Sequence, residues 1–250
     1  MNALRRLTAV AVAAVGFAPA LRAQIPGAPL FSNPRFATGF RIHADLAQPT
    51  GSNVVAGTNQ TVVEGGVGFV LGPIGIDANV GALSSDLKNA QQCQANPSTC
   101  NTKASVSGSA LGQIKIMGGA EDPGRVSIFG GASYTLTAAQ AAGLTAAQQA
   151  ALGVDTSHYL TIPIGVAIGY HIPLGLLSVN LWGAPRYVLI NQLNCGSTCN
   201  NTNMFRWAVG ADVPIFKILS VRAAYDSGSK NGVTTSFWGV GASVGLGGMR

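Results

Sequence analysis

The sequence predicts an all-β fold, an antiparallel up-and-down transmembrane β-barrel of about ten strands. Three observations lead to this prediction. Only 10% of the 250 residues are charged, whereas a typical soluble domain has about 25%. The chain contains no run of about 18 apolar residues, the length that a membrane-spanning helix needs. Apolar and polar residues instead alternate with a period of two in one segment after another, which is the pattern of strands with one apolar face.

Residues 1–23 are expected to be a removable signal peptide. Arg5 and Arg6 precede an apolar stretch from Leu7 to Ala18, which is too short to span a membrane. Cleavage after Ala23 would lower the formal net charge from +6 to +3, so the basic excess is largely an export signal and no nucleic-acid partner is expected. Residues 24–35 are expected to be an extended lead-in, and residues 36–250 to form the barrel.

The first five strands each place apolar residues on one face and small or ionic residues on the other. In the first strand, for example, Arg41, His43 and Asp45 alternate with apolar residues. Tight turns at Gly72-Pro73 and at 121–124 separate the second strand from the third and the fourth from the fifth. The expected ranges are Phe36–Ala47, Val62–Leu71, Ile74–Leu83, Ala104–Met117 and Arg125–Thr135.

The last five strands repeat the pattern. The clearest examples are the eighth and ninth, in which every charged residue lies on one face. Pro163 and Pro185 interrupt the sixth and seventh strands. Both lie equally far from the predicted turn at Pro173–Gly175, so they are expected to face each other and to mark where the membrane-spanning residues end. The expected ranges are Tyr159–Tyr170, Leu177–Leu189, Phe205–Val213, Leu219–Asp226 and Thr234–Leu246.

The connections between these strands alternate in length, long after odd-numbered strands and tight after even-numbered ones. Long outer loops and short periplasmic turns are typical of outer-membrane barrels. Charged residues are also confined to the polar face of the strands. A charge that faces lipid at mid-depth costs about 2 to 4 kcal/mol, so this face is expected to point into the lumen. The residues expected to line the lumen as an ionic network are Arg41, His43, Asp45, Glu64, Asp77, Lys115, Arg125, Arg186, Arg206, Asp212, Arg222 and Asp226.

Aromatic residues on the opposite face are expected to form a girdle at the membrane interface, near the long loops. They are Tyr134, Tyr187, Phe205, Trp207, Tyr225 and Trp238. The many glycines fit neither phosphate loops nor nucleotide fingerprints, because no helix follows them. They are better explained by a tight barrel interior.

Together, the alternating strands, the expected signal peptide and the loop asymmetry make the chain resemble the superfamily of small outer-membrane β-barrels, the OmpA or OmpX type with extra strands. The resemblance covers the chain from Phe36 to the C-terminus. The resemblance implies an outer-membrane location, contact with membrane lipid and a lipopolysaccharide-type outer leaflet, and assembly by the barrel-assembly machinery. Such barrels usually end in an aromatic residue, whereas this chain ends in Gly247-Gly248-Met249-Arg250.

Four cysteines in an exported chain predict disulfides in the outer loops. They are Cys93, Cys100, Cys195 and Cys199. Local pairing within each loop and a bridge between the two loops both remain open. No metal site is expected, because no histidine lies at ligand spacing from either cysteine pair, and no cofactor is expected.

The nearly balanced charges of the lumen favour a non-enzymatic role, either as an envelope scaffold or in surface contacts. The alternative is a narrow passive channel for small polar solutes, although a selective pore would be expected to show one charge sign in excess. A third hypothesis is an omptin-like surface hydrolase that uses Asp155 and His158. We interpret His43 and Asp45 as a hydrogen-bonded pair rather than as a catalytic base with its orienting carboxylate.

Overall fold

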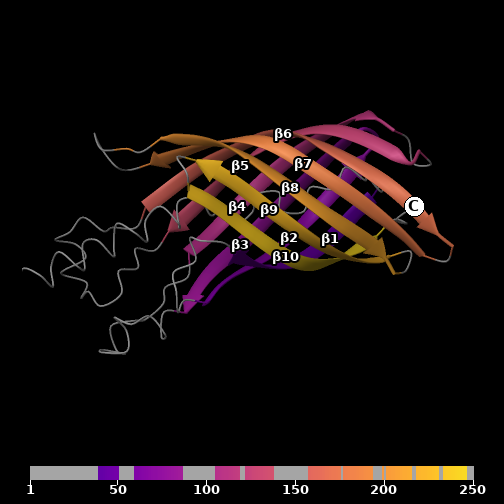
Figure 1. Ribbon diagram of the computed structural model, residues 1–250, viewed down its shortest axis with the longest axis horizontal. Helices are drawn as coiled ribbons and strands as arrows, with labels where there is room; N and C mark the ends of the chain where they lie inside the picture. The colour runs from indigo at the N-terminus through magenta and orange to yellow at the C-terminus, as the bar shows by residue number, and fades with distance from the viewer. Residues whose placement is uncertain are drawn as a thin grey trace, which may run out of the picture.

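Ten antiparallel strands close into one barrel in the computed structural model (Figure 1). The structure describes residues 39–50, 59–86, 105–118, 122–137, 157–175, 177–193, 199, 201–215, 218–230 and 233–246. The strands are β1 (Gly39–Thr50), β2 (Asn59–Leu71), β3 (Ile74–Asp86), β4 (Ser105–Met117), β5 (Gly124–Thr137), β6 (Ser157–Leu174), β7 (Leu177–Leu193), β8 (Thr202–Pro214), β9 (Leu219–Lys230) and β10 (Val233–Leu246). The predicted closed barrel of ten strands is confirmed.

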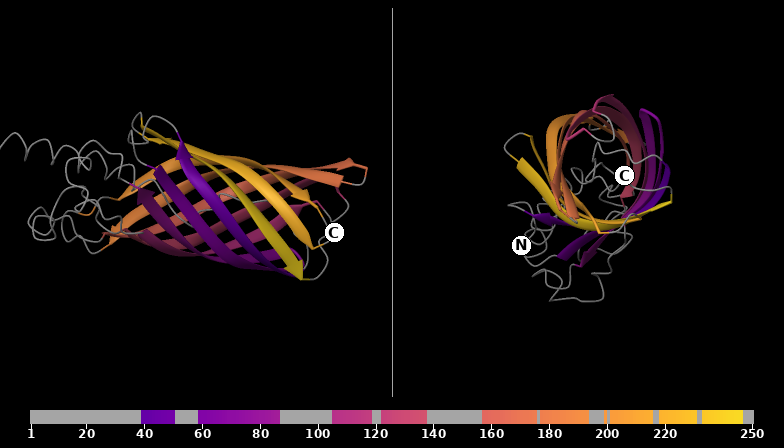
Figure 2. Two further views of the ribbon diagram at one scale, coloured as in Figure 1. Left: turned by 90° about the horizontal axis from the view of Figure 1, so that it is seen from below. Right: turned by 90° about the vertical axis from the view of Figure 1, so that its right-hand side faces the viewer.

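Each strand pairs with its neighbours in the sequence, and β1 pairs with β10 to close the barrel. This closing pair, which we call the seam, runs from Phe40 opposite Leu246 to Thr50 opposite Ser236. The connections after β2, β4, β6 and β8 meet at one end of the barrel, and those after the odd-numbered strands meet at the other (Figure 2). Gly72 and Gly175 begin tight turns with φ of 59° and 74°, which glycine adopts without strain.

The predicted long loop after the ninth strand is wrong. Strand β9 continues to Lys230, which pairs with Val233 at the start of β10, so only residues 231–232 connect them. The extension contains small polar residues that fit either a loop or a strand. Its pairing is supported by a hydrogen bond of 2.9 Å between the Ser227 and Ser236 hydroxyls. This connection is therefore short, although it lies at the same end as the longer ones.

The predicted alignment of Pro163 with Pro185 is also wrong. Pro163 lies opposite Val188 on β7, and Pro185 lies opposite Trp207 on β8. The cause is the position of the turn, which follows Leu174 and is therefore centred later than the predicted Pro173–Gly175. Strands β6 and β7 continue past both prolines, so the prolines end neither strand.

The two faces of the barrel wall differ in polarity. Large apolar side chains on the outer face are exposed, for example Phe69 at 50%, Val80 at 70% and Ile164 at 58%. Every charged strand side chain that the structure describes lies on an inward-facing position. Among the described residues, no helix has the length and apolar character needed to cross a membrane. The barrel therefore has two distinct surfaces, a polar lumen that contains the charged residues and an apolar outer face.

Candidate functional site: the barrel lumen

The structure places all twelve predicted lumen residues on inward-facing strand positions. Eight are buried, namely His43, Asp45, Arg125, Arg186, Arg206, Asp212, Arg222 and Asp226, and the other four, Arg41, Glu64, Asp77 and Lys115, are partly exposed. Many of them gather in two groups, which are held together by ion pairs within each group. Glu64, Arg125 and Asp212 also interact with other residues.

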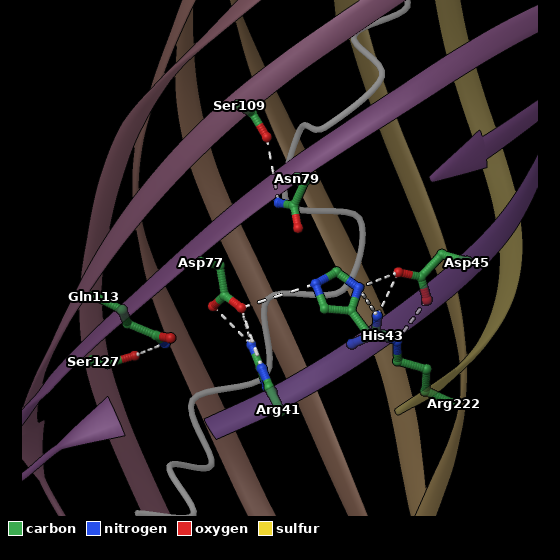
Figure 3. A network of polar contacts seen from close by, with 9 residues as sticks. All are labelled: Arg41, His43, Asp45, Asp77, Asn79, Ser109, Gln113, Ser127 and Arg222. Atoms are coloured by element: carbon green, nitrogen blue, oxygen red, sulfur yellow. Dashed lines mark hydrogen bonds and ion pairs between the residues drawn. The ribbon is translucent and has the colours of Figure 1, made fainter. Parts of the chain in front are cut away.

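The first group, which we call the seam cluster, contains Arg41, His43, Asp45, Asp77 and Arg222 (Figure 3). Arg222 donates from Nε to Asp45 Oδ1 at 2.7 Å, and its Nη2 also bonds the second oxygen of Asp45. His43 Nδ1 lies 2.8 Å from both Asp45 Oδ2 and Arg222 Nη2. Arg41 Nη2 donates to the two oxygens of Asp77 at 2.7 and 2.8 Å. His43 is thus held between charged groups.

Each arginine–aspartate ion pair of the seam cluster crosses an intervening strand at a glycine. Gly241 on β10 lies between Arg222 and Asp45, and Gly68 on β2 lies between Arg41 and Asp77. A Cβ atom at Gly241 would overlap the Asp45 carboxylate, and one at Gly68 would lie 2.6 Å from Arg41 Nε. The glycines therefore provide the space through which long side chains link strands that are not neighbours.

The second group, which we call the Arg186 triad, contains Arg186, Arg206 and Asp226 from three consecutive strands. Arg206 donates from Nε to Asp226 Oδ1 at 2.8 Å, and Arg186 Nη2 donates to Asp226 Oδ2. Arg206 Nη1 also donates to Thr235 Oγ1 on β10 at 2.8 Å. Exposure is 2% for Arg186, 3% for Arg206 and 1% for Asp226, so these charges are almost fully removed from solvent.

Three polar contacts on the remaining wall of the described barrel join adjacent strands. Asn79 bonds Ser109 at 3.3 Å, Gln113 bonds Ser127 at 2.5 Å, and His171 bonds Asn180 at 2.8 Å. The pairs that skip a strand extend from β7 across the seam to β3. The ion pairs of the two groups that skip a strand thus lie on both sides of the seam, the pairing of β1 with β10 that closes the barrel.

The structure adds an apolar cluster inside the lumen that the sequence analysis missed. It contains Leu111, Phe129, Ala167, Trp182, Ala184, Ala208 and Ala224, and we call it the apolar plug. Phe129 is 3% exposed and Trp182 is 5% exposed. One sign of this cluster was visible in the sequence. Phe129 follows Arg125 and Ser127 at a spacing of two residues, so it lies on the same, polar face of the strand. A large ring on the polar face of a strand indicates a filled interior.

On the outer face, all six predicted girdle aromatics point away from the lumen. Tyr225 is partly covered by Trp207, whose ring centre lies 5.6 Å away. Tyr134 bonds Nδ1 of His158, which occupies an outward-facing position of β6. Asp155, the second residue of the hydrolase hypothesis, lies outside the described residues.

The remaining predicted sites fall largely outside the described part of the chain. This applies to residues 1–38, which include the predicted signal peptide, and to Cys93, Cys100 and Cys195. Cys199 is described and is disulfide-bonded, while the connectivity stays a prediction. Within the described ranges, no group of three or more His, Cys, Asp or Glu side chains could hold a metal ion.

No protein-family model matches this sequence, and no curated protein matches it either. In three dimensions the chain is similar to the β domain of the Bordetella autotransporter BrkA, with a TM-score of 0.52 and 10% identity over 84% of this chain and 100% of that one. This chain has the outer-membrane β-barrel fold.

Two further outer-membrane barrels are less similar. The translocator domain of the autotransporter NalP from Neisseria meningitidis has a TM-score of 0.45 and 13% identity over 87% of this chain and 91% of that one. The outer-membrane protease OmpT from Escherichia coli has a TM-score of 0.38 and 9% identity over 83% of this chain and 94% of that one. At such identities the similarity concerns the fold alone.

Proposed function

We propose that the chain is a non-conducting, non-enzymatic scaffold of the outer membrane, which presents its longer loops at the cell surface. The observation that supports this role is the filled lumen. Phe129, Trp182 and Arg186 point inward, yet their exposures are only 3%, 5% and 2%. Side chains that line an open aqueous pore would be accessible to water. The ion pairs and the apolar plug instead resemble a packed protein interior.

The apolar outer face supports the membrane location. On β2 the exposed apolar residues extend from Val63 to Leu71. At about 3.3 Å per residue and a tilt of roughly 40°, this stretch covers about 20 Å along the barrel axis. Outer-membrane barrels carry an apolar band of about 25 Å between aromatic girdles. We therefore place the girdle beside a lipopolysaccharide-type outer leaflet and propose the barrel-assembly machinery as the partner during insertion.

The surface-contact part of the proposal concerns the end with the longer connections. Connections 51–58, 87–104, 138–156 and 194–201 join strands at this end, whereas the opposite end has connections as short as residues 72–73. A rigid barrel that is cross-linked through its lumen is a suitable base for loops that contact other molecules.

Conductance across a planar lipid bilayer tests the proposal. The wild-type barrel should give no defined current steps, because its own side chains close the lumen. A Phe129→Ala, Trp182→Ala double variant removes the two largest rings of the apolar plug and should give steps. This variant is also the control for insertion. Regular steps from the wild-type protein would contradict the scaffold function.

A narrow passive channel remains the second candidate, because one wall of the lumen is less buried than the other. Arg41, Glu64, Asp77, Asn79 and Ser109, on strands β1 to β4, are all partly exposed. They form a polar strip along which water could pass. If the wild-type barrel conducts, Ser109→Trp should block the current by filling this strip. An unchanged current in that variant would exclude this path.

A further inference from the structure

The charges of the Arg186 triad do not balance. Two guanidinium groups, from Arg186 and Arg206, share the single carboxylate of Asp226. All three side chains are at most 3% exposed, so bulk water cannot solvate the excess positive charge. A buried charge without a compensating partner is strongly destabilising. The excess of one positive charge therefore needs a counter-charge.

Hydrogen bonding identifies Arg186 as the arginine of the triad with side-chain nitrogens that lack a partner. Arg206 uses all three of its nitrogens, on Asp226 and on the side chain and backbone oxygens of Thr235. Arg186 uses only Nη2, on Asp226. Its Nε and Nη1 are buried and have no hydrogen-bond partner. Leaving buried donors unsatisfied costs about 1 to 3 kcal/mol for each group, and more when the group is charged.

Apart from Asp226, the residues that flank Arg186 in the sheet offer no side-chain acceptor. Its inward-facing neighbours along β7 are Ala184 and Val188, and the residues opposite it are Gly165 on β6 and Arg206 on β8. None of these side chains can accept a hydrogen bond. The excess positive charge and the two donors without a partner therefore coincide at one buried position, where the flanking side chains are aliphatic apart from the cationic Arg206.

We propose that Arg186 binds one small monovalent anion, a halide or a carboxylate, through Nε and Nη1 inside the barrel. An anion is preferred to a neutral water because it supplies both the missing acceptor and the missing negative charge. Since the site is closed to solvent, the anion enters as the barrel closes and then stays as part of the structure. This inference is independent of the scaffold function, because a bound ion and a conducting pore are measured separately.

Anomalous diffraction tests the halide form directly. The full-length protein is refolded in detergent with sodium bromide, crystallised and measured at the bromine absorption edge. The expected result is a bromide peak in contact with Arg186 Nε or Nη1, which is absent from Arg186→Met. The proposal would be overturned if a water molecule occupied that place in the bromide crystals and if crystals grown with formate also showed no anion there.

Unfolding in urea distinguishes the two ligand classes. The wild-type protein is compared in sodium chloride, sodium formate and sodium gluconate at equal ionic strength. Gluconate is too large for a buried site and serves as the reference. If the ligand is a halide, the urea midpoint should be higher in chloride than in gluconate. If the ligand is a carboxylate, the midpoint should be higher in formate than in gluconate. Arg186→Met should show the same midpoint in all three salts. If this variant does not fold, Arg206→Met is used in its place. It also leaves one arginine with Asp226, so its midpoint should likewise be the same in all three salts.

Lys115→Met is the matched control, because Lys115 is a lumen cation outside the triad. It should keep the wild-type dependence on the anion. Equal wild-type midpoints in the three salts would overturn the proposal, and so would an anion dependence that survives in both Arg186→Met and Arg206→Met.

Discussion

Replacing Asp226 with asparagine should be the most destabilising single charge change in the lumen. Asp226 is 1% exposed and accepts bonds from both Arg186 and Arg206. Asparagine keeps the size of the side chain and removes its charge, which leaves two guanidiniums buried together. Removing one partner of a buried ion pair costs about 3 to 5 kcal/mol. Because two arginines lose their counter-charge here, we expect a value at or above the upper end of this range.

The assay is reversible unfolding in urea in lipid or detergent, followed by far-ultraviolet circular dichroism. Arg186→Met is the informative comparison, because it leaves Arg206 and Asp226 as a balanced pair and should cost much less than Asp226→Asn. The double variant Asp226→Asn, Arg186→Met should recover part of the stability lost in Asp226→Asn, since only one uncompensated arginine remains. A loss below about 1 kcal/mol for Asp226→Asn would refute the reasoning, because it would mean that the triad is solvated.

The remaining predictions concern the seam and the outer face. Gly241→Val should destabilise the barrel by about 1 to 3 kcal/mol or more through overlap with the Asp45 carboxylate, whereas the outward-facing Ala223→Val should change stability by less than about 0.5 kcal/mol; unfolding in urea measures both. Arg222→Met should cost about 3 to 5 kcal/mol, because it leaves Asp45 buried without its arginine, and equal stability of the variant would contradict the seam cluster. Val80→Arg should cost about 2 to 4 kcal/mol in lipid bilayers if Val80 faces the hydrocarbon, and no loss there would place Val80 in water.

The faces of the strands could be predicted from the sequence because side chains alternate with a period of two. Arg206 and Asp212 were expected to point inward, and both are buried in the lumen. Alternation does not determine register, which depends on where each turn begins. The predicted facing of Pro163 and Pro185 failed for this reason, and so did the end of β9.

The contacts within the lumen could not be predicted from the sequence, because they also depend on the register between strands. Linking Arg222 to Asp45 requires knowing that Gly241 lies between them, and residues 45 and 222 are brought together only by the closure of the barrel. Phe129 and Trp182 could be assigned to the inner face by parity, but their packing against alanines from several strands depends on barrel geometry. Residue type thus predicted which side chains line the lumen, and register decided which of them meet.

Fluorescence quenching of single tryptophans tests the closed lumen and the lipid-facing surface together. The chain has three tryptophans, Trp182 inside and Trp207 and Trp238 outside. Variants that keep one tryptophan each, with phenylalanine at the other two positions, are inserted into vesicles and treated with brominated lipid or aqueous acrylamide. We predict that brominated lipid quenches Trp207 and Trp238 strongly, and that neither quencher reaches Trp182. Strong quenching of Trp182 by acrylamide would show a water-filled lumen and contradict the account.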